Sequence, residues 1–187
     1  MASTENNYVT HGLRGQVGGL FVFKTVNGKT IVAASPRKSN QEPSPKQIKQ
    51  QELFQEAVIY GKTVMVTPEL RALYETSVPA GGAVYQVALA DFLNAPKIKG
   101  IDVSKYVGDP GNTISIRVTD DFIVKNVAVT IVNEDGSLVE HGEAIKQANG
   151  VDWLFTATEK NDALTGDKIV VRAGDIPGNI TTSDVNL

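Results

Sequence analysis

Cysteine is absent from this sequence, and histidine occurs only at His11 and His141. Without a thiol the chain has no disulfide, no cysteine nucleophile and no thiolate metal site, and two histidines argue against a multi-histidine metal centre. Aromatic residues make up only 6% of the chain, and no apolar run approaches the roughly 18 residues of a membrane span. The polar first residues are not followed by the apolar segment of a signal peptide. We therefore expect neither a membrane span nor a cleaved leader.

Hydrophobic residues, by contrast, make up 41% of the 187 residues, and charged residues make up 21%. This composition is typical of a globular chain, and a chain of this length buries enough surface to hold a core. The hydrophobic period changes after Pro96. We therefore expect an α+β chain of two parts: residues 1–96 form a β-hairpin arm with a helical layer, and residues 97–187 form an all-β immunoglobulin-like sandwich.

Charge is unevenly distributed along the chain. Residues 1–50 carry seven basic and two acidic side chains, whereas residues 96–187 carry nine basic and fourteen acidic ones. One interpretation is a basic arm that docks on the acidic part of a neighbouring copy, since opposite potentials steer association. The alternative is chance clustering on a lightly charged surface. Nucleic acid is disfavoured as a partner, because no aromatic platform accompanies the basic residues.

The front of the chain predicts a β-hairpin. Residues 20–26 and 29–34 are rich in β-forming residues and flank Asn27-Gly28, a dipeptide that suits a two-residue hairpin turn. Glycines punctuate residues 12–19, which indicates sharply turning backbone or close packing, and the first ten residues are typical of a mobile tail. An isolated hairpin is marginal in water, so it must pack on the rest of the chain or on another subunit.

Three amphipathic helices are predicted next. Ser44-Pro45 is a helix-start pattern with Gln47 closing a capping box, and apolar residues from Ile48 to Met65 recur at helical spacing. Thr67-Pro68 repeats the start pattern, and a third stripe runs from Val84 to Asn94. After Pro96 the period becomes two, which indicates about seven short strands, with Trp153 as the core anchor.

Few residues suggest chemistry. The glycine-rich segment 15–19 precedes a strand, so it is not a dinucleotide loop, and both histidines are expected at the surface, His141 in a loop. No motif pins a pair of catalytic groups, so we expect neither an enzyme nor a cofactor. Turn capping is the favoured role of the loop aspartates. Calcium is the weaker alternative, because it needs six to eight oxygen ligands; its candidate ligands are Asp109, Asp120, Asp121 and Asp175.

Two resemblances accompany these patterns. The segment from Arg117 to Phe122, the alternating strand after it, the strand at Trp153 and the ending Ile169 to Asn179 resemble bacterial immunoglobulin-like domains, over roughly residues 97–187. The resemblance implies a sandwich and an extracellular or particle-associated location, with no export route indicated. The front half is similar to an uncharacterised family of bacterial proteins without an assigned activity, through Gly15-Gln16-Val17-Gly18, Gly28-Lys29, Pro36-Arg37-Lys38 and Pro43 to Gln47.

The combination predicts a non-enzymatic structural protein that self-assembles, as a filament, a surface layer or a virion component. Its expected partners are copies of itself, through an interface formed by Gly15, Val17, Gly18, Leu20, Phe21, Val22, Phe23, Ile31, Val32 and Arg37. The alternative is a cell-surface or glycan-binding adhesion module whose partner is a surface glycan or another structural protein. Exposed aromatic residues on the sandwich loops would support that alternative, and only Tyr106 and Phe122 are candidates.

Overall fold

The computed structural model describes residues 2–3, 12–26, 28–36 and 42–187. The chain divides into two compact units, Met1–Pro45 and Lys46–Leu187. The boundary lies well before the expected one at residue 96, because the three helices belong to the same unit as the C-terminal strands. None of the helices in the described part of the chain is long and apolar enough to cross a membrane.

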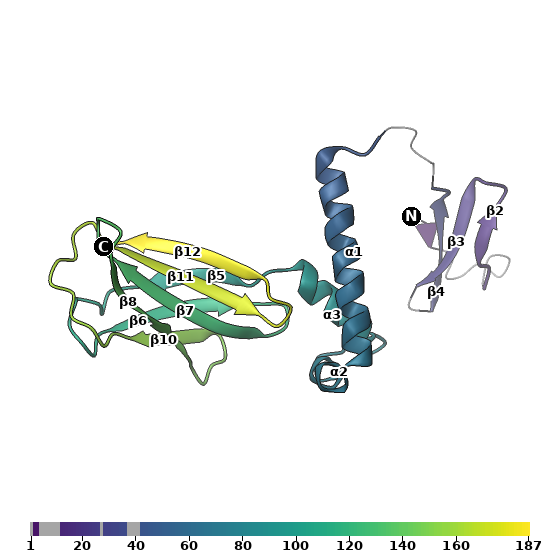
Figure 1. Ribbon diagram of the computed structural model, residues 1–187. Coiled ribbons are helices and arrows are strands. Elements are labelled where there is room, and N and C mark those ends of the chain that lie inside the picture. The colour runs from purple at the N-terminus through teal and green to yellow at the C-terminus, as the bar shows by residue number, and fades with distance from the viewer. Residues whose placement is uncertain (1, 4–11, 27, 37–41) are drawn as a thin grey trace. The chain divides into compact units, whose positions relative to one another are not determined.

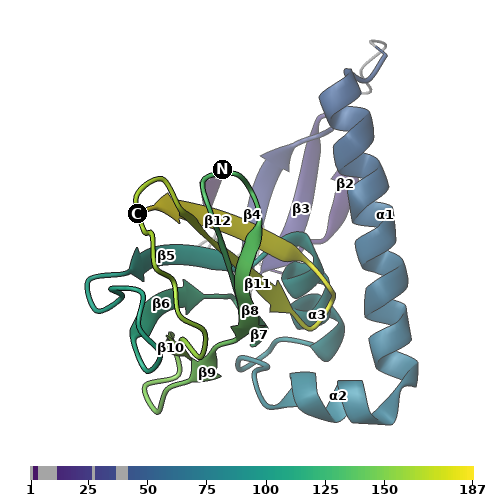
Figure 2. The same ribbon diagram turned by 60° about the vertical axis from the view of Figure 1, so that its left-hand side comes forward.

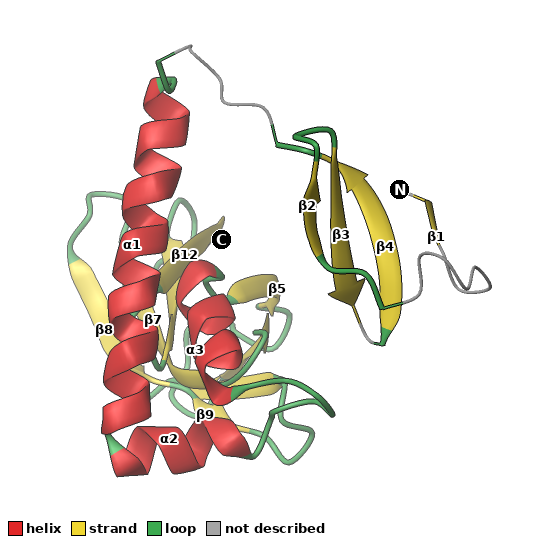
Figure 3. Ribbon diagram, turned by 90° about the vertical axis from the view of Figure 1, so that its right-hand side faces the viewer, coloured by secondary structure: helices red, strands yellow, loops and turns green. Residues whose placement is uncertain are grey.

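The N-terminal unit is an antiparallel sheet (Figure 3). Its strand order is β1 (Ala2–Ser3), β4 (Lys29–Ala34), β3 (Phe21–Val26) and β2 (Gly15–Val17). The predicted hairpin is confirmed, because β3 pairs with β4 and Val26 lies opposite Lys29 across the turn. The two outer strands are additions: β1 forms where a mobile tail is predicted, and β2 forms within the glycine-rich stretch. Asn27 and residues 4–11 lie outside the described residues.

All three helices form, and each begins where its sequence pattern predicts. They are α1 (Pro45–Val66), α2 (Pro68–Glu75) and α3 (Val84–Leu93) (Figure 2). Pro45 and Pro68 occupy the first helical position, where the fixed φ of proline favours the helix and its missing N–H costs nothing. The side chain of Thr67 does not cap α2; its hydroxyl donates a hydrogen bond to the Thr63 carbonyl at 2.9 Å, in the last turn of α1.

The long helix α1 packs only through its C-terminal half. Ala57, Gly61 and Val64 are buried, and the absence of a side chain at Gly61 lets the ring of Tyr85 approach the α1 backbone. The N-terminal half extends beyond α2 and α3 (Figures 1 and 3), and Ile48, Leu53 and Phe54 are exposed there. The prediction of one inward stripe along the whole helix is therefore wrong for its first half.

The remaining strands form two antiparallel four-stranded sheets packed together (Figure 1). Period-two alternation buries one face of each sheet, and Trp153 is the predicted core anchor, with 6% of its surface exposed. In order across each sheet, the strands are β5 (Lys97–Asp102), β6 (Thr113–Thr119), β10 (Asp152–Thr156) and β9 (Ile145–Lys146), and then β12 (Ile180–Asn186), β11 (Lys168–Asp175), β7 (Val124–Val132) and β8 (Leu138–Glu143).

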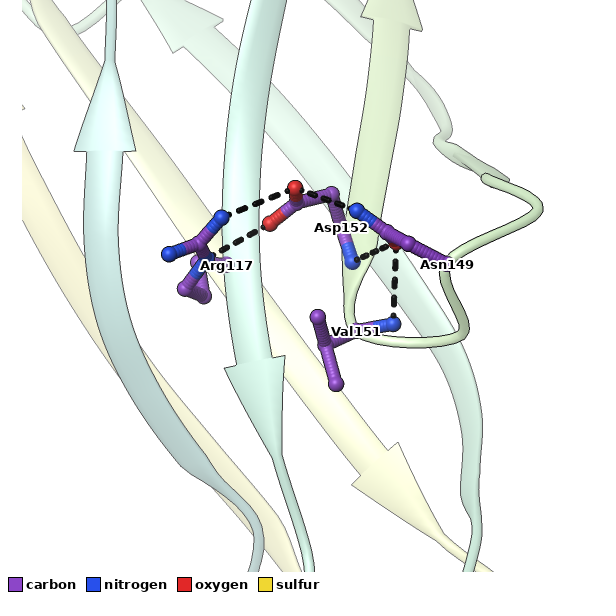
Figure 4. A network of polar contacts seen from close by, with 4 residues as sticks. All are labelled: Arg117, Asn149, Val151 and Asp152. Carbon is purple, nitrogen blue, oxygen red and sulfur yellow. Dashed lines mark hydrogen bonds and ion pairs between the residues drawn. The ribbon is translucent and has the colours of Figure 1, made fainter.

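A polar network fixes the turn before β10 (Figure 4). Arg117 donates two hydrogen bonds to the carboxylate of Asp152, at 2.8 and 3.0 Å. Asn149 donates to the same carboxylate at 2.7 Å and accepts the backbone N–H groups of Val151 and Asp152. These hydrogen bonds, from Arg117 first and then from Asn149, lower the pKa of Asp152 to about 2.

Candidate functional site

The register of the N-terminal sheet separates its side chains into two faces. Phe21 lies opposite Val17 on one side and Ala34 on the other, and Phe23 lies opposite Val32. Directly opposite residues, and alternate residues of one strand, point to the same face of a sheet. One face therefore carries five apolar side chains and is called the apolar sheet face below: Val17, Phe21, Phe23, Val32 and Ala34.

The described residues of the N-terminal unit form no hydrophobic core beneath the apolar sheet face. Among the described residues 12–26, 28–36 and 42–45, Thr30 alone is buried, and no hydrophobic side chain is. Phe21 is 52% exposed and Val17 is 55% exposed. A folded sheet normally buries one face against another layer, and the described residues of this unit do not form such a layer over the apolar sheet face.

The predicted interface residues divide between the two faces and the turns. Val17, Phe21, Phe23 and Val32 belong to the apolar sheet face, on which Gly15 lies opposite Phe23. Val22 and Ile31 lie on the other face, where Val26, Lys24 and Lys29 make the surface mixed. Gly18 and Leu20 lie between β2 and β3, and the Leu20 side chain is 68% exposed. Arg37 is outside the described residues.

A second candidate site is an acidic cluster in the C-terminal unit. One carboxylate oxygen from each of Asp91, Asp120 and Asp175 lies within 4.8 Å of the other two. Each of these residues comes at the end of a series of apolar side chains on one face of its strand or helix. Asp120 follows the inward row of β6, Asp175 ends the inward row of β11, and Asp91 shares one face of α3 with Val84 and Ala88.

The three carboxylates differ in their partners. Asp175 accepts the backbone N–H groups of Gly178 and Asn179 at 2.8 and 2.7 Å, so it caps a turn as the sequence favours. Asp91 is 1% exposed and accepts a hydrogen bond from the Tyr74 hydroxyl through Oδ2, whereas its Oδ1 has no partner. Neither buried oxygen of Asp120 has a hydrogen-bond partner among the described residues.

Burial is the main cause of the shifted pKa values in this cluster. It raises the pKa of Asp91 to about 7, against a lowering effect of the Tyr74 hydrogen bond. Burial also raises the pKa of Asp120, against a lowering effect of the neighbouring Asp121 backbone N–H, and the charges of Asp175 and Asp121 raise it further. The Tyr74 hydroxyl, which also lies 2.8 Å from the Tyr60 hydroxyl, has a strongly raised pKa because it is buried and bonded to Asp91. Tyr74 therefore keeps its proton and donates a hydrogen bond to Asp91.

Two of the four predicted calcium ligands are absent from this cluster. Asp121 is exposed and accepts a hydrogen bond from Asn94 at 2.8 Å. Asp109 lies between β5 and β6, at the opposite end of β6 from Asp120. Sequence reasoning missed Asp91, although its spacing from Val84 and Ala88 places it on a buried helix face.

The two aromatic residues named as glycan-binding candidates are not exposed. Tyr106 is buried, and its hydroxyl accepts a hydrogen bond from Asn161. Phe122 is partly buried and stacks on Tyr74 at a centroid distance of 4.4 Å. A cavity of about 390 Å³ over β5, β6 and β10 is lined by no aromatic residue.

The predictions for the two histidines have different outcomes. His141 is exposed as predicted but lies in β8, where its Nδ1 is 2.9 Å from the Thr130 hydroxyl, so its placement in a loop is wrong. His11 lies outside the described residues.

Comparison with known proteins does not assign the chain to a family. No protein-family model matches the chain, and no curated protein matches it. Among solved structures, the crystal structure of an engineered protein aligns with 55% of this chain at 16% identity and a TM-score of 0.34. The alignment spans 26% of the engineered protein's length.

Proposed function

We propose that this protein is a non-enzymatic structural protein that self-associates through its N-terminal sheet. The observation that carries the proposal is the apolar sheet face, which lies on a unit without a buried hydrophobic residue among those described. The occupant we propose is a second copy of the chain. Charge supports this choice, because residues 1–50 are basic and residues 96–187 are acidic, and complementary potentials favour encounter between copies.

Further surfaces support an assembling role. β2 and β1 are the outermost strands of the described N-terminal sheet, and outer strands accept strand addition from another chain. In the C-terminal unit, the N-terminal half of α1 is a separate surface that a neighbour would cover, with Ile48 and Phe54 exposed. A head-to-tail contact of this kind that does not close produces a filament, and a surface layer or a virion component is built from repeated contacts in the same way.

The two packed C-terminal sheets are proposed to be an immunoglobulin-like domain. The support is the resemblance of residues 97–187 to the bacterial domains together with their antiparallel pairing. An extracellular or particle-associated location belongs to the same proposal. No residue of this unit is assigned a catalytic role.

The test compares two matched substitutions in β3. Phe21→Gln removes a side chain from the apolar sheet face, and Val26→Gln removes one from the opposite face; the two residues are 52% and 47% exposed. Covering the remaining half of a phenylalanine buries about 100 Å², or about 2.5 kcal/mol. We therefore expect Phe21→Gln to weaken self-association at least tenfold and Val26→Gln to change it less than threefold.

Multi-angle light scattering over a wide range of concentration measures the association. A full-length protein that remains monomeric at high concentration contradicts the proposal, and so do two variants that weaken assembly equally. We also expect assembly to weaken as salt rises, because salt screens the contribution of charge. Assembly that is independent of salt would remove the charge argument and leave apolar burial as its cause.

A further inference from the structure

We infer that Asp91, Asp120 and Asp175 form a binding site for a divalent cation, with Ca²⁺ as the ion that suits the donor set. The site lies where α3 meets the ends of β6 and β11. It is independent of the proposed self-association, because all three residues belong to the C-terminal unit.

The spacing of the oxygens fits one ion. Three atoms that are at most 4.8 Å apart share a point within about 2.8 Å of each, close to the 2.3–2.6 Å of calcium–oxygen bonds. Carboxylate oxygens are hard ligands, which suit Ca²⁺ and Mg²⁺ better than softer transition metals. Ca²⁺ fits better than Mg²⁺, since it tolerates irregular geometry and longer bonds.

Unpartnered buried oxygens point directly to a ligand. Asp91 is 1% exposed, and its Oδ1 has no hydrogen-bond partner. Both oxygens of Asp120 are buried without one as well. A buried acceptor without a donor costs free energy, and several such oxygens close together cost more because their charges repel. One cation between them would satisfy the oxygens and neutralise much of the charge.

The surrounding side chains do not supply that charge. In the described part of the chain, none of the ion pairs within 4.0 Å involves Asp91, Asp120 or Asp175. Lys97 acts on Asp120 only through its charge, and the pKa of Asp120 remains raised. A positive ion would therefore replace a counter-charge that the fold does not provide.

Neighbouring groups orient Asp91 and Asp175. Tyr74 holds Oδ2 of Asp91, so Oδ1 is left for the cation, in the way that outer hydrogen bonds orient metal ligands. Asn179 donates to Asp175 at 2.8 Å and to the Phe92 carbonyl at 3.1 Å, which ties the turn between β11 and β12 to α3 beside the site. A cavity of about 200 Å³ reaches Asp120 but neither Asp91 nor Asp175, and Lys97, Lys99 and Thr119 also line it. It offers room for the waters that complete calcium coordination.

The chemical alternative is a shared proton. Two buried carboxylates relieve their repulsion by keeping one proton between them, and the raised pKa values of Asp91 and Asp120 fit that state as well. The two explanations differ in one respect, because only the cation site responds to added CaCl₂ at constant pH.

The experiment uses the full-length protein stripped with a chelator, at pH 7.5. Tb³⁺ takes the oxygen ligands of Ca²⁺ and luminesces when a nearby tyrosine is excited, and Tyr74 is bonded to Asp91. We expect sensitised Tb³⁺ luminescence that CaCl₂ displaces. Asp120→Asn should weaken binding at least tenfold, whereas Asp121→Asn, which changes the adjacent exposed carboxylate, should change it less than twofold.

Thermal melting of the unmodified protein keeps the inference testable if a variant does not fold. Calcium at a hundredfold excess over its dissociation constant should raise the melting temperature by about 5–10 °C. A melting temperature that millimolar CaCl₂ does not move, or equal Tb³⁺ affinity in Asp120→Asn and Asp121→Asn, would overturn the inference in favour of the shared proton. Neither Tb³⁺ luminescence nor thermal melting measures assembly. The cation site can therefore be refuted without refuting self-association, and self-association can be refuted without refuting the cation site.

Discussion

Alanine at Gly108 should destabilise the C-terminal unit far more than alanine at Gly111. Both glycines have positive φ, +90° and +89°, in the connection between β5 and β6. A Cβ on Gly111 would meet no atom within 4 Å, whereas a Cβ on Gly108 would lie 2.3 Å from the backbone oxygen of Asn161. The pair therefore separates the cost of backbone strain from the cost of a clash.

The expected magnitudes follow from these contacts. Positive φ costs an alanine about 1–2 kcal/mol at either site. The clash at Gly108 must also displace Asn161, whose backbone N–H bonds Gly108 at 2.8 Å and whose side chain donates to buried Asp167 at 2.7 Å. Loss of these two hydrogen bonds, one of them to a buried carboxylate, adds about 2–4 kcal/mol. We expect a total loss of about 3–6 kcal/mol for Gly108→Ala.

Urea unfolding followed by tryptophan fluorescence measures both variants. The chain contains one tryptophan, and Trp153 lies in the core between the two sheets, so the signal reports the unit that carries both substitutions. A difference of less than about 0.5 kcal/mol between the variants, which is within the usual range of surface substitutions, would refute the packing of Gly108 against Asn161.

Two further predictions concern polar groups. Tyr74→Phe removes the hydroxyl that donates to Asp91, so thermal melting should show a loss of about 1–3 kcal/mol; Tyr85→Phe, in which no such donor is lost, should change stability little. Asp152→Asn tests the link to Arg117. Because the folded pKa of Asp152, about 2, is below the unfolded value near 3.9, its contribution is present above pH 4 and is lost as pH falls toward 2. Acid titration should therefore bring wild type and Asp152→Asn together near pH 2, and a stability gap that persists there contradicts the prediction.

The elements could be predicted because their signals are local. A turn dipeptide between two β-rich runs specifies the hairpin, and prolines at the first helical position mark the starts of α1 and α2. Strict alternation in β6 and β11 identified both strands and their buried faces. Each of these patterns depends on residues within one turn or one strand.

What covers an element could not be predicted in the same way. The apolar stripe of α1 is continuous in sequence, yet Phe54 is exposed and Ala57 is buried. The difference arises because α2 and α3 reach only the C-terminal half of the helix, and their extent is a property of tertiary structure. The division into compact units at Pro45 differs from the expected division at residue 96 for a related reason. An amphipathic helix predicts that its apolar face is covered, without specifying which part of the chain covers it.

The acidic cluster was missed because two of its aspartates also fit a local turn-capping pattern. Asp120 and Asp175 follow turn-forming patterns, and the expected capping by Asp175 does occur. The same two residues also continue the inward rows of β6 and β11, where the next position would ordinarily be apolar. A carboxylate at the buried end of an apolar row is costly unless it is paired. The sequence signal was therefore the position of each aspartate, and not the number of acids in the loops. Asp120 and Asp175 continue the buried alternate positions of their strands, and Asp91 lies at helical spacing from Val84 and Ala88.

The apolar sheet face and the acidic cluster each lack something that the described residues of their own unit do not supply. The sheet lacks apolar cover, which the proposed second copy of the chain would provide. The cluster lacks a directly paired positive charge, which the proposed cation would provide. These needs respond differently to solution conditions. Salt weakens the charge-assisted part of self-association by screening, whereas CaCl₂ at constant pH acts on the carboxylates of the cluster. Both proposals therefore rest on the chemistry of these two surfaces and not on the fold, since a fold of packed sheets supports many unrelated functions.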